Sequence, residues 1–117
     1  MKLMTKEIQK KLTKQNLYRC DGYQIKGRKK QKPYLKLFNP TGSGTWLISE
    51  IEDDGDTMFG LCDLGHGSPE LGYVSLKELE SLKLPFGLSI ERDISFTPDK
   101  TLSEYADEAR SNRYIIS

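Results

Sequence analysis

Residues 45–63 constrain the fold of this 117-residue chain more than any other stretch. Two β-rich runs, 45–51 and 56–62, flank the dipeptide Asp54-Gly55. Asp-Gly suits a type I′ turn, whose two central residues need positive φ angles and whose twist matches that of the flanking strands. We therefore predict a β-hairpin in which Asp53 pairs with Asp56.

The predicted register decides which side chains share a face, because side chains alternate along a strand. It places Glu50 opposite Phe59 and Ile48 opposite Leu61. The other face is also apolar, so we expect another element to cover part of it. The face turned to the core is expected to carry Trp46, Ile48, Phe59 and Leu61.

The rest of the chain alternates short helical and extended patterns. Helices are predicted over 5–14, from Ser75 for about two turns, and from Thr101 to about Asn112, because each opens with a capping residue. Strands are predicted over 33–38, 70–74 and 89–96. The sequence thus predicts one α+β domain over 1–117, with a twisted, mainly antiparallel sheet of about five strands and two or three short helices.

Charge is distributed unevenly along the chain, although the net charge is only +1. The N-terminal part, 1–36, holds 12 Lys/Arg and two acidic residues, whereas residues 37–117 hold six Lys/Arg and 15 acidic residues. We divide the domain into this basic part, an acidic sheet-forming part at 37–99, and a C-terminal helix and tail at 100–117. Either the two charges neutralise each other in the fold, or the basic part binds a polyanion or acidic partner.

The basic stretch at 26–32 is a candidate nucleic-acid site. Lys/Arg side chains near an aromatic ring can hold the phosphates of a single strand and stack its bases. A basic loop between strands has the same sequence pattern, and the lysines of the first helix similarly fit either a binding face or a solvated surface. The candidate residues are Arg28, Lys29, Lys30, Lys32 and Tyr34.

Acidic residues gather at the predicted hairpin tip, where they could dock on a basic protein groove. Exposed acids there also favour solubility, and Mg²⁺ or Ca²⁺ binding is a less favoured alternative because the spacing is not that of an EF-hand. The candidates are Glu50, Glu52, Asp53, Asp54 and Asp56.

Arg92 stands in an otherwise apolar row of the predicted strand 89–96. A guanidinium keeps its charge, so a buried one needs carboxylate or carbonyl partners. We expect an internal ion pair with Glu50 or Glu70. The alternative is that Arg92 binds an external phosphate or carboxylate.

The sequence offers little for catalysis or metal binding. The chain has one histidine, His66, and two cysteines, Cys20 and Cys62, too few for a structural zinc site. We predict no catalytic residue, no metal and no cofactor; an enzyme would have to depend on carboxylates near Arg92. We see no secretory leader and no apolar run of membrane-spanning length, so we expect a cytoplasmic protein without membrane contact.

Several segments resemble a known family. They are 55–61 (GDTMFGL), 69–73 (PELGY), 75–80 (SLKELE), 86–93 (FGLSIERD), 102–104 (LSE) and the opening 2–7 (KLMTKE). Between about residues 46 and 103 the chain is similar to the domain of unknown function 2958, with the basic stretch 26–32 outside the resemblance. The resemblance implies no activity, but it implies an origin in plasmids, conjugative elements or phages.

The resulting hypothesis is a non-catalytic interaction protein of a mobile genetic element. Its expected partner is a host or element-encoded protein or protein–nucleic acid complex, and its expected action on that partner is inhibition of the anti-CRISPR type. One alternative is a nucleic-acid-binding accessory factor for plasmid or conjugative-element maintenance, which would contact single-stranded nucleic acid. The other alternative is a carboxylate-dependent enzyme using Glu50, Glu70, Glu91 and Arg92.

Overall fold

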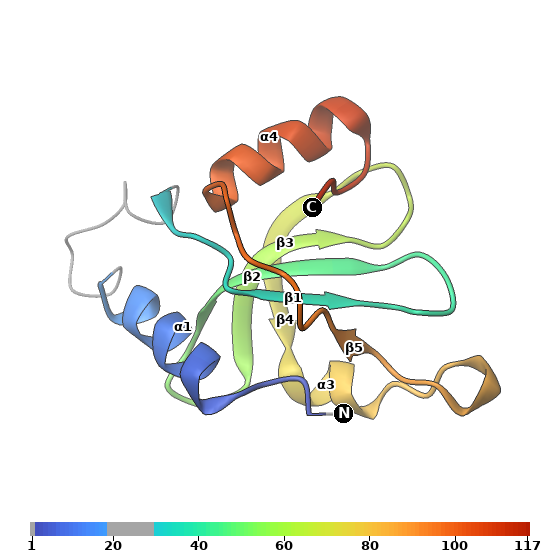
Figure 1. Cartoon of the computed structure of the whole chain (residues 1–117), viewed down its shortest axis with the longest axis horizontal. Helices are drawn as coiled ribbons and strands as arrows, with labels where there is room; N and C mark the ends of the chain where they lie inside the picture. Colours follow the sequence, from blue (N-terminus) through green and yellow to red (C-terminus); the bar gives the residue numbers. More distant parts are fainter. Residues whose placement is uncertain (1, 19–29) are drawn as a thin grey trace.

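Within residues 2–18 and 30–117, which the computed structural model describes, five strands form one antiparallel sheet and three α-helices pack around it (Figure 1). The strand order is β4-β3-β2-β1-β5. The predicted α+β fold is therefore confirmed. The strands are β1 (Leu35–Phe38), β2 (Thr45–Ile51), β3 (Thr57–Asp63), β4 (Glu70–Ser75) and β5 (Glu91–Arg92). The helices are α1 (Lys6–Tyr18), α3 (Leu76–Ser81), the 3-10 helix η2 (Pro85–Gly87) and α4 (Leu102–Asn112).

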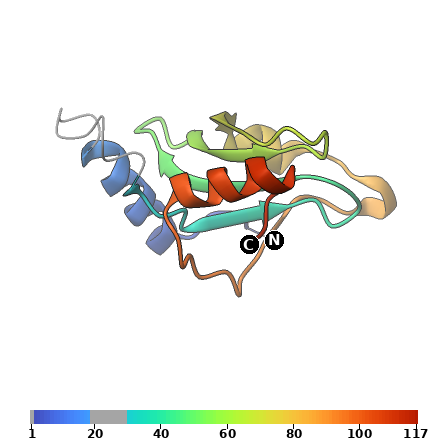
Figure 2. The ribbon, with the colours of Figure 1, turned by 90° about the horizontal axis from the view of Figure 1, so that it is seen from above.

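Each face of the sheet is covered by helices, so the core has two parts. On one face, residues of α1 and α3 pack with Trp46, Ile48 and Met58. On the other face, α4 packs over Leu47 and Leu61 (Figure 2). The expectation that a further element covers the second apolar face of the hairpin is thus confirmed.

The hairpin forms where it was predicted, and the predicted pairing of Glu50 with Phe59 is confirmed, but the register differs beyond that pair. Ile48 lies opposite Gly60, and the pairing then shifts so that Glu50 lies opposite Phe59. This β-bulge adds one residue to β2. Because side chains alternate along a strand, the residues of β2 before the bulge point to the face opposite to the one that an unbroken register predicts. The prediction that Trp46 and Ile48 share a face with Phe59 and Leu61 is therefore wrong.

The turn of the hairpin is longer than the predicted two residues. The closing hydrogen bond runs from the Glu52 N–H to the Thr57 carbonyl oxygen at 2.8 Å, which leaves four residues in the loop. Only Gly55 takes a positive φ, of 70°. Asp54 acts through its side chain instead, because its carboxylate accepts hydrogen bonds from the N–H groups of Asp56 and Thr57, both at 2.9 Å.

The bulge is also where α1 joins the sheet. Gln15 Nε2 donates to the Ser49 carbonyl at 2.6 Å, at the extra residue of β2. The same Gln15 amide exchanges hydrogen bonds with the backbone of Lys32, donating at 3.0 Å and accepting at 3.2 Å. Gln15 thus links the bulge in β2 to the segment that leads into β1.

The helix starts were predicted more accurately than the last strand. The Thr5 hydroxyl accepts from the Ile8 N–H at 3.1 Å at the start of α1, and Thr101 and Glu104 form a complete capping box on α4. The predicted strand 89–96 is wrong beyond the two residues of β5, and Ile94 is 75% exposed.

Candidate nucleic-acid interface

The fold brings two basic segments of the chain side by side. Besides the Gln15–Lys32 bonds, Gln31 Nε2 donates to the Gln15 carbonyl oxygen at 3.1 Å near the end of α1. Residues 30–34 therefore lie along α1 although 11 undescribed residues, 19–29, separate the two segments in sequence. We call the surface that they form the basic end; its lysines are Lys6, Lys10, Lys11, Lys14, Lys30 and Lys32.

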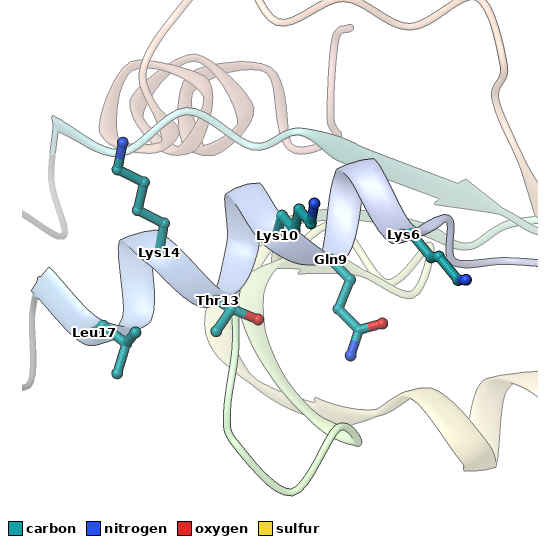
Figure 3. Close-up of a pocket in the computed structure, with 6 residues that line it drawn as sticks. All are labelled: Lys6, Gln9, Lys10, Thr13, Lys14 and Leu17. Carbon is teal, nitrogen blue, oxygen red and sulfur yellow. The ribbon is translucent and has the colours of Figure 1, made fainter.

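One part of the basic end is the outward face of α1. Lys6, Lys10 and Lys14 are four residues apart, so they follow one another about 6 Å apart along the helix axis. Figure 3 shows these lysines standing along the helix with three uncharged side chains. Among the described residues, those lining the hollow on this face are Lys6, Gln9, Lys10, Thr13, Lys14 and Leu17.

The second part is a hollow of about 350 Å³ between α1, the start of β1 and the segment after β5. Here Lys11 Nζ lies 4.9 Å from the centroid of the Tyr34 ring. Two ammonium groups, two aromatic rings and two hydroxyl groups thus line one concave site. We call it the tyrosine hollow; it is lined by Ile8, Lys11, Lys32, Tyr34, Phe96, Thr97 and Pro98.

The structure brings together some of the predicted nucleic-acid residues. Lys32 and Tyr34 line the tyrosine hollow, and Lys30 is exposed beside it. Arg28 and Lys29 lie outside the described residues. No pattern in the sequence indicates that Lys11 joins this group, because the contact between α1 and Tyr34 is long-range.

Phe96 and Thr97 were also missed as site residues. The alternating pattern of 89–96 assigned Phe96 to a strand, whereas it lies in the irregular segment that leads to α4. Its ring also packs near that of Tyr105, with centroids 6.3 Å apart. The tyrosine hollow is therefore formed partly by a segment anchored on the opposite face of the sheet.

The acidic hairpin tip differs from the expected docking surface. Glu50 is only 1% exposed and accepts a hydrogen bond from Asn16 Nδ2 at 3.1 Å, so its assignment to an exposed tip is wrong. Glu50 lies opposite Phe59, just past the bulge, and Asn16 near the end of α1 reaches its carboxylate. Glu52 is half-buried, and Asp53 is exposed.

The other two acids of the tip have structural roles. The Asp54 carboxylate accepts hydrogen bonds from groups of its own turn. These bonds lower the pKa of Asp54, the Thr57 hydroxyl having the largest effect and the two backbone N–H groups smaller ones. Asp56 accepts from the Ser75 hydroxyl at 2.9 Å and from the Lys77 N–H at 2.8 Å, which ties the hairpin to the start of α3. These hydrogen bonds explain both carboxylates without an external partner.

Arg92 does not form the predicted carboxylate pair with Glu70. Glu70 lies on β4 and Arg92 on β5, the two outer strands of the sheet, about 19 Å apart at the usual strand spacing. Leu37 of β1 pairs with Arg92 on one side and with Trp46 of β2 on the other. Glu50 is four residues further along β2 than Trp46, so the predicted ion pair between Arg92 and Glu50 is also wrong. Its Nη1 donates instead to the Lys2 carbonyl oxygen at 2.8 Å. Binding of an external anion by Arg92 stays a prediction.

The remaining chemical candidates are separate from one another. Burial raises the pKa of the Cys62 thiol to about 11, so it stays protonated at neutral pH and is a poor nucleophile. His66 is exposed on the loop after β3. Across residues 2–18 and 30–117, three or more His, Cys, Asp or Glu side chains nowhere gather as metal ligands.

Comparison with known proteins identifies a family but no activity. In the described part of the chain, no helix is both long and apolar enough to cross a bilayer. No curated protein and no solved structure matches the chain significantly. The family match runs well beyond the expected 46–103 and spans the basic stretch 26–32, so the expectation that this stretch lies outside it is wrong. Over residues 3–116 the chain belongs to the family described as "Protein of unknown function (DUF2958)".

Proposed function

We propose that this protein is a non-catalytic binding protein that holds single-stranded nucleic acid at its basic end. The tyrosine hollow carries the proposal, because it combines lysines with aromatic rings in one concave surface. Proteins that bind single strands use this combination: cations attract the phosphates, and rings stack on the bases.

The outward face of α1 extends the same surface. A strand leaving the tyrosine hollow along the helix meets the ammonium groups of Lys14, Lys10 and Lys6 in succession. The arrangement supports attraction to the phosphates, which is independent of base sequence.

A binding assay on full-length protein tests this proposal. The probe is a fluorescein-labelled single-stranded DNA 20-mer of mixed sequence, followed by fluorescence anisotropy at several salt concentrations. We expect Lys11→Gln/Lys32→Gln to weaken binding and to lower the slope of log K against log salt by about 1.4, since each phosphate contact on a single strand contributes about 0.7. Tyr34→Ala is expected to weaken binding by about tenfold through lost stacking.

The matched control removes the same charge elsewhere. Lys77→Gln/Lys83→Gln neutralises two exposed lysines in and beyond α3, and should leave both affinity and salt slope near wild type. Equal losses in the two double variants would mean that only net charge matters. Wild-type protein that fails to bind at 50 mM salt would contradict the proposal.

Within this proposal, the protein serves a mobile genetic element, as its family resemblance implies. Its nucleic-acid partner would then be either the element's own single-stranded DNA or a strand held in a host defence complex of the CRISPR type. A tagged pull-down from the bacterial host separates these outcomes. Recovery of a guide-RNA complex favours an anti-defence inhibitor, whereas recovery of DNA alone favours an accessory factor in element maintenance.

The residues that a carboxylate-dependent enzyme would need lie far apart, which favours a non-catalytic role. Glu50 is buried on β2, Glu70 is exposed on β4, and Arg92 lies at the far edge of the sheet. These groups do not converge on one substrate-sized site. Metal-dependent hydrolysis of the bound DNA by purified protein would contradict this part of the proposal.

A further inference from the structure

The loop after α3 carries the most exposed large apolar side chain of the described residues. Phe86, in η2, is 95% exposed, and Leu82 and Leu88 on either side of it are 44% and 41% exposed. Figures 1 and 2 both show this loop projecting from the body of the protein, at the end of the molecule opposite α1. The ring therefore stands in solvent, where it contributes nothing to the core.

The backbone at Phe86, which carries the ring, has an unfavourable conformation. Phe86 has φ 63° and ψ 25°, in the left-handed region that side chains with a Cβ rarely adopt. The loop is closed by hydrogen bonds from the Leu84 N–H to the Leu88 carbonyl at 2.9 Å and from the Leu88 N–H to the Pro85 carbonyl at 3.3 Å. Pro85 restricts the approach to Phe86, and Gly87 follows it with φ 70°. The loop is thus preorganised to present the phenyl ring.

From this geometry we infer that the loop 82–89, which we call the Phe86 loop, docks the protein onto a folded partner protein. The partner must offer an apolar pocket that receives the Phe86 ring, with room for Leu82 and Leu88 at its rim. Lys83 is the only charged residue of the loop, so a carboxylate beside the pocket would complete the match. A preorganised aromatic anchor surrounded by smaller apolar contacts is typical of the residues that dominate protein–protein binding.

The charges around the loop favour a protein over a lipid surface. Membrane attachment through exposed aromatic residues is strengthened by several cations near anionic headgroups. Here one lysine, Lys83, is accompanied by the acidic residues Glu80 and Glu91 at the two ends of the segment. A loop backbone closed by its own hydrogen bonds also suits a pocket of defined shape, whereas insertion into lipid does not require one.

The test places a photo-crosslinking phenylalanine analogue, p-benzoylphenylalanine, at position 86 of the full-length protein in its bacterial host. The same analogue at position 94 is the control, because Ile94 is also strongly exposed, at 75%, in the turn after β5. The protein crosslinked at position 86 is then purified, and its affinity for each variant is measured by calorimetry. We expect Phe86→Ala to bind it at least about tenfold more weakly, and Ile94→Ala to bind it as wild type does.

A second variant separates docking from folding. Phe86→Gly removes the ring and relieves the left-handed backbone, so its melting temperature should equal or exceed that of wild type while partner binding is lost. A large fall in melting temperature would show a structural role for the ring and overturn the inference. The inference is also overturned if position 86 crosslinks only to a second copy of this chain or only to lipid. Crosslinking at position 86 that is no stronger than at position 94 would overturn it too, as would normal binding of the partner by Phe86→Ala.

Discussion

Gly60 lies in the middle of β3, between Ile48 of β2 and Gly72 of β4. A Cβ at position 60 would overlap the Leu47 carbonyl oxygen and lie 2.8 Å from the Ile48 Cα, next to the bulge. A Cβ at Gly72, directly opposite in the ladder, would meet nothing within 4 Å. Two paired glycines thus differ in the space around them, and only one of them is required by the fold.

This difference predicts opposite effects of the same substitution. Gly60→Ala should lower the free energy of unfolding by about 2 kcal/mol or more, because the clash is with backbone that a side-chain rotation cannot relieve. Gly72→Ala should leave it unchanged or raise it by up to about 1 kcal/mol, because glycine within a strand is less favourable than alanine. Urea denaturation measures both, and a tolerated Gly60→Ala would contradict the bulge geometry.

At the scale of elements, α4 depends on its first turn. The Glu104 N–H donates to Thr101 Oγ1 at 3.2 Å, and Glu104 Oε1 accepts from the Thr101 N–H at 3.0 Å. The helix then places Leu102, Tyr105 and two alanines against the second core. The Ile115 N–H after the helix donates to Asp63 Oδ2 at 3.0 Å, so the segment after α4 is bonded to the last residue of β3.

Loss of the capping residue should therefore loosen α4. Thr101→Ala is expected to lower the free energy of unfolding by about 1 kcal/mol, because one N–H group of the first turn loses its acceptor. Amide hydrogen exchange should rise in α4 more than in α1. Ser103→Ala, two residues further along in the first turn of α4, is the control and should have little effect on either measurement.

The capping box also predicts a pH dependence. The Thr101 backbone N–H, and after it the Thr101 hydroxyl, lowers the pKa of Glu104 below its ordinary value of 4.5. A carboxylate with a lowered folded-state pKa stabilises the fold above about pH 4.5, and this stabilisation is lost as the pH falls through the folded-state pKa. Glu104→Gln should therefore lower the melting temperature at pH 7, and the difference from wild type should shrink toward pH 3. A difference that stays constant from pH 7 to pH 3 would contradict this.

At the scale of the whole molecule, the two proposed surfaces lie at opposite ends. The molecule measures 45 × 32 × 22 Å, and along its longest axis the basic end and the Phe86 loop lie on opposite sides of the sheet (Figure 1). Sites this far apart, with no shared side chains, are expected to contribute independently to binding. The architecture fits a protein that contacts a nucleic-acid strand at one end and a protein at the other.

Independence can be measured with variants of both ends. Phe86→Ala should leave affinity for the DNA 20-mer unchanged, and Lys11→Gln/Lys32→Gln should leave affinity for a nucleic-acid-free crosslinked partner unchanged. If the partner is a protein–nucleic acid complex, the combined variant should lose the sum of the two free energies to within about 0.5 kcal/mol. A larger deviation would mean that the two ends are coupled through the sheet.

The sequence alone determined the elements whose signals are local. Thr5, Ser75 and Thr101 mark helix starts because capping involves residues three apart, and Gly55 marks the hairpin turn because positive φ is a local property. The α+β class and the family resemblance followed from the same local patterns. The basic character of residues 1–36 was also evident from composition.

Only the tertiary structure decided what depends on contacts between distant segments. The bulge in β2 is stabilised by Gln15, 34 residues away in sequence, and it places Trp46 and Phe59 on opposite faces of the sheet. Lys11 and Tyr34 meet because α1 packs on β2 and the segment before β1 lies along the helix, and the pattern of either segment alone does not encode that contact. Periodicity assumes one continuous register, so a single extra residue is sufficient to exchange the faces of all residues beyond it.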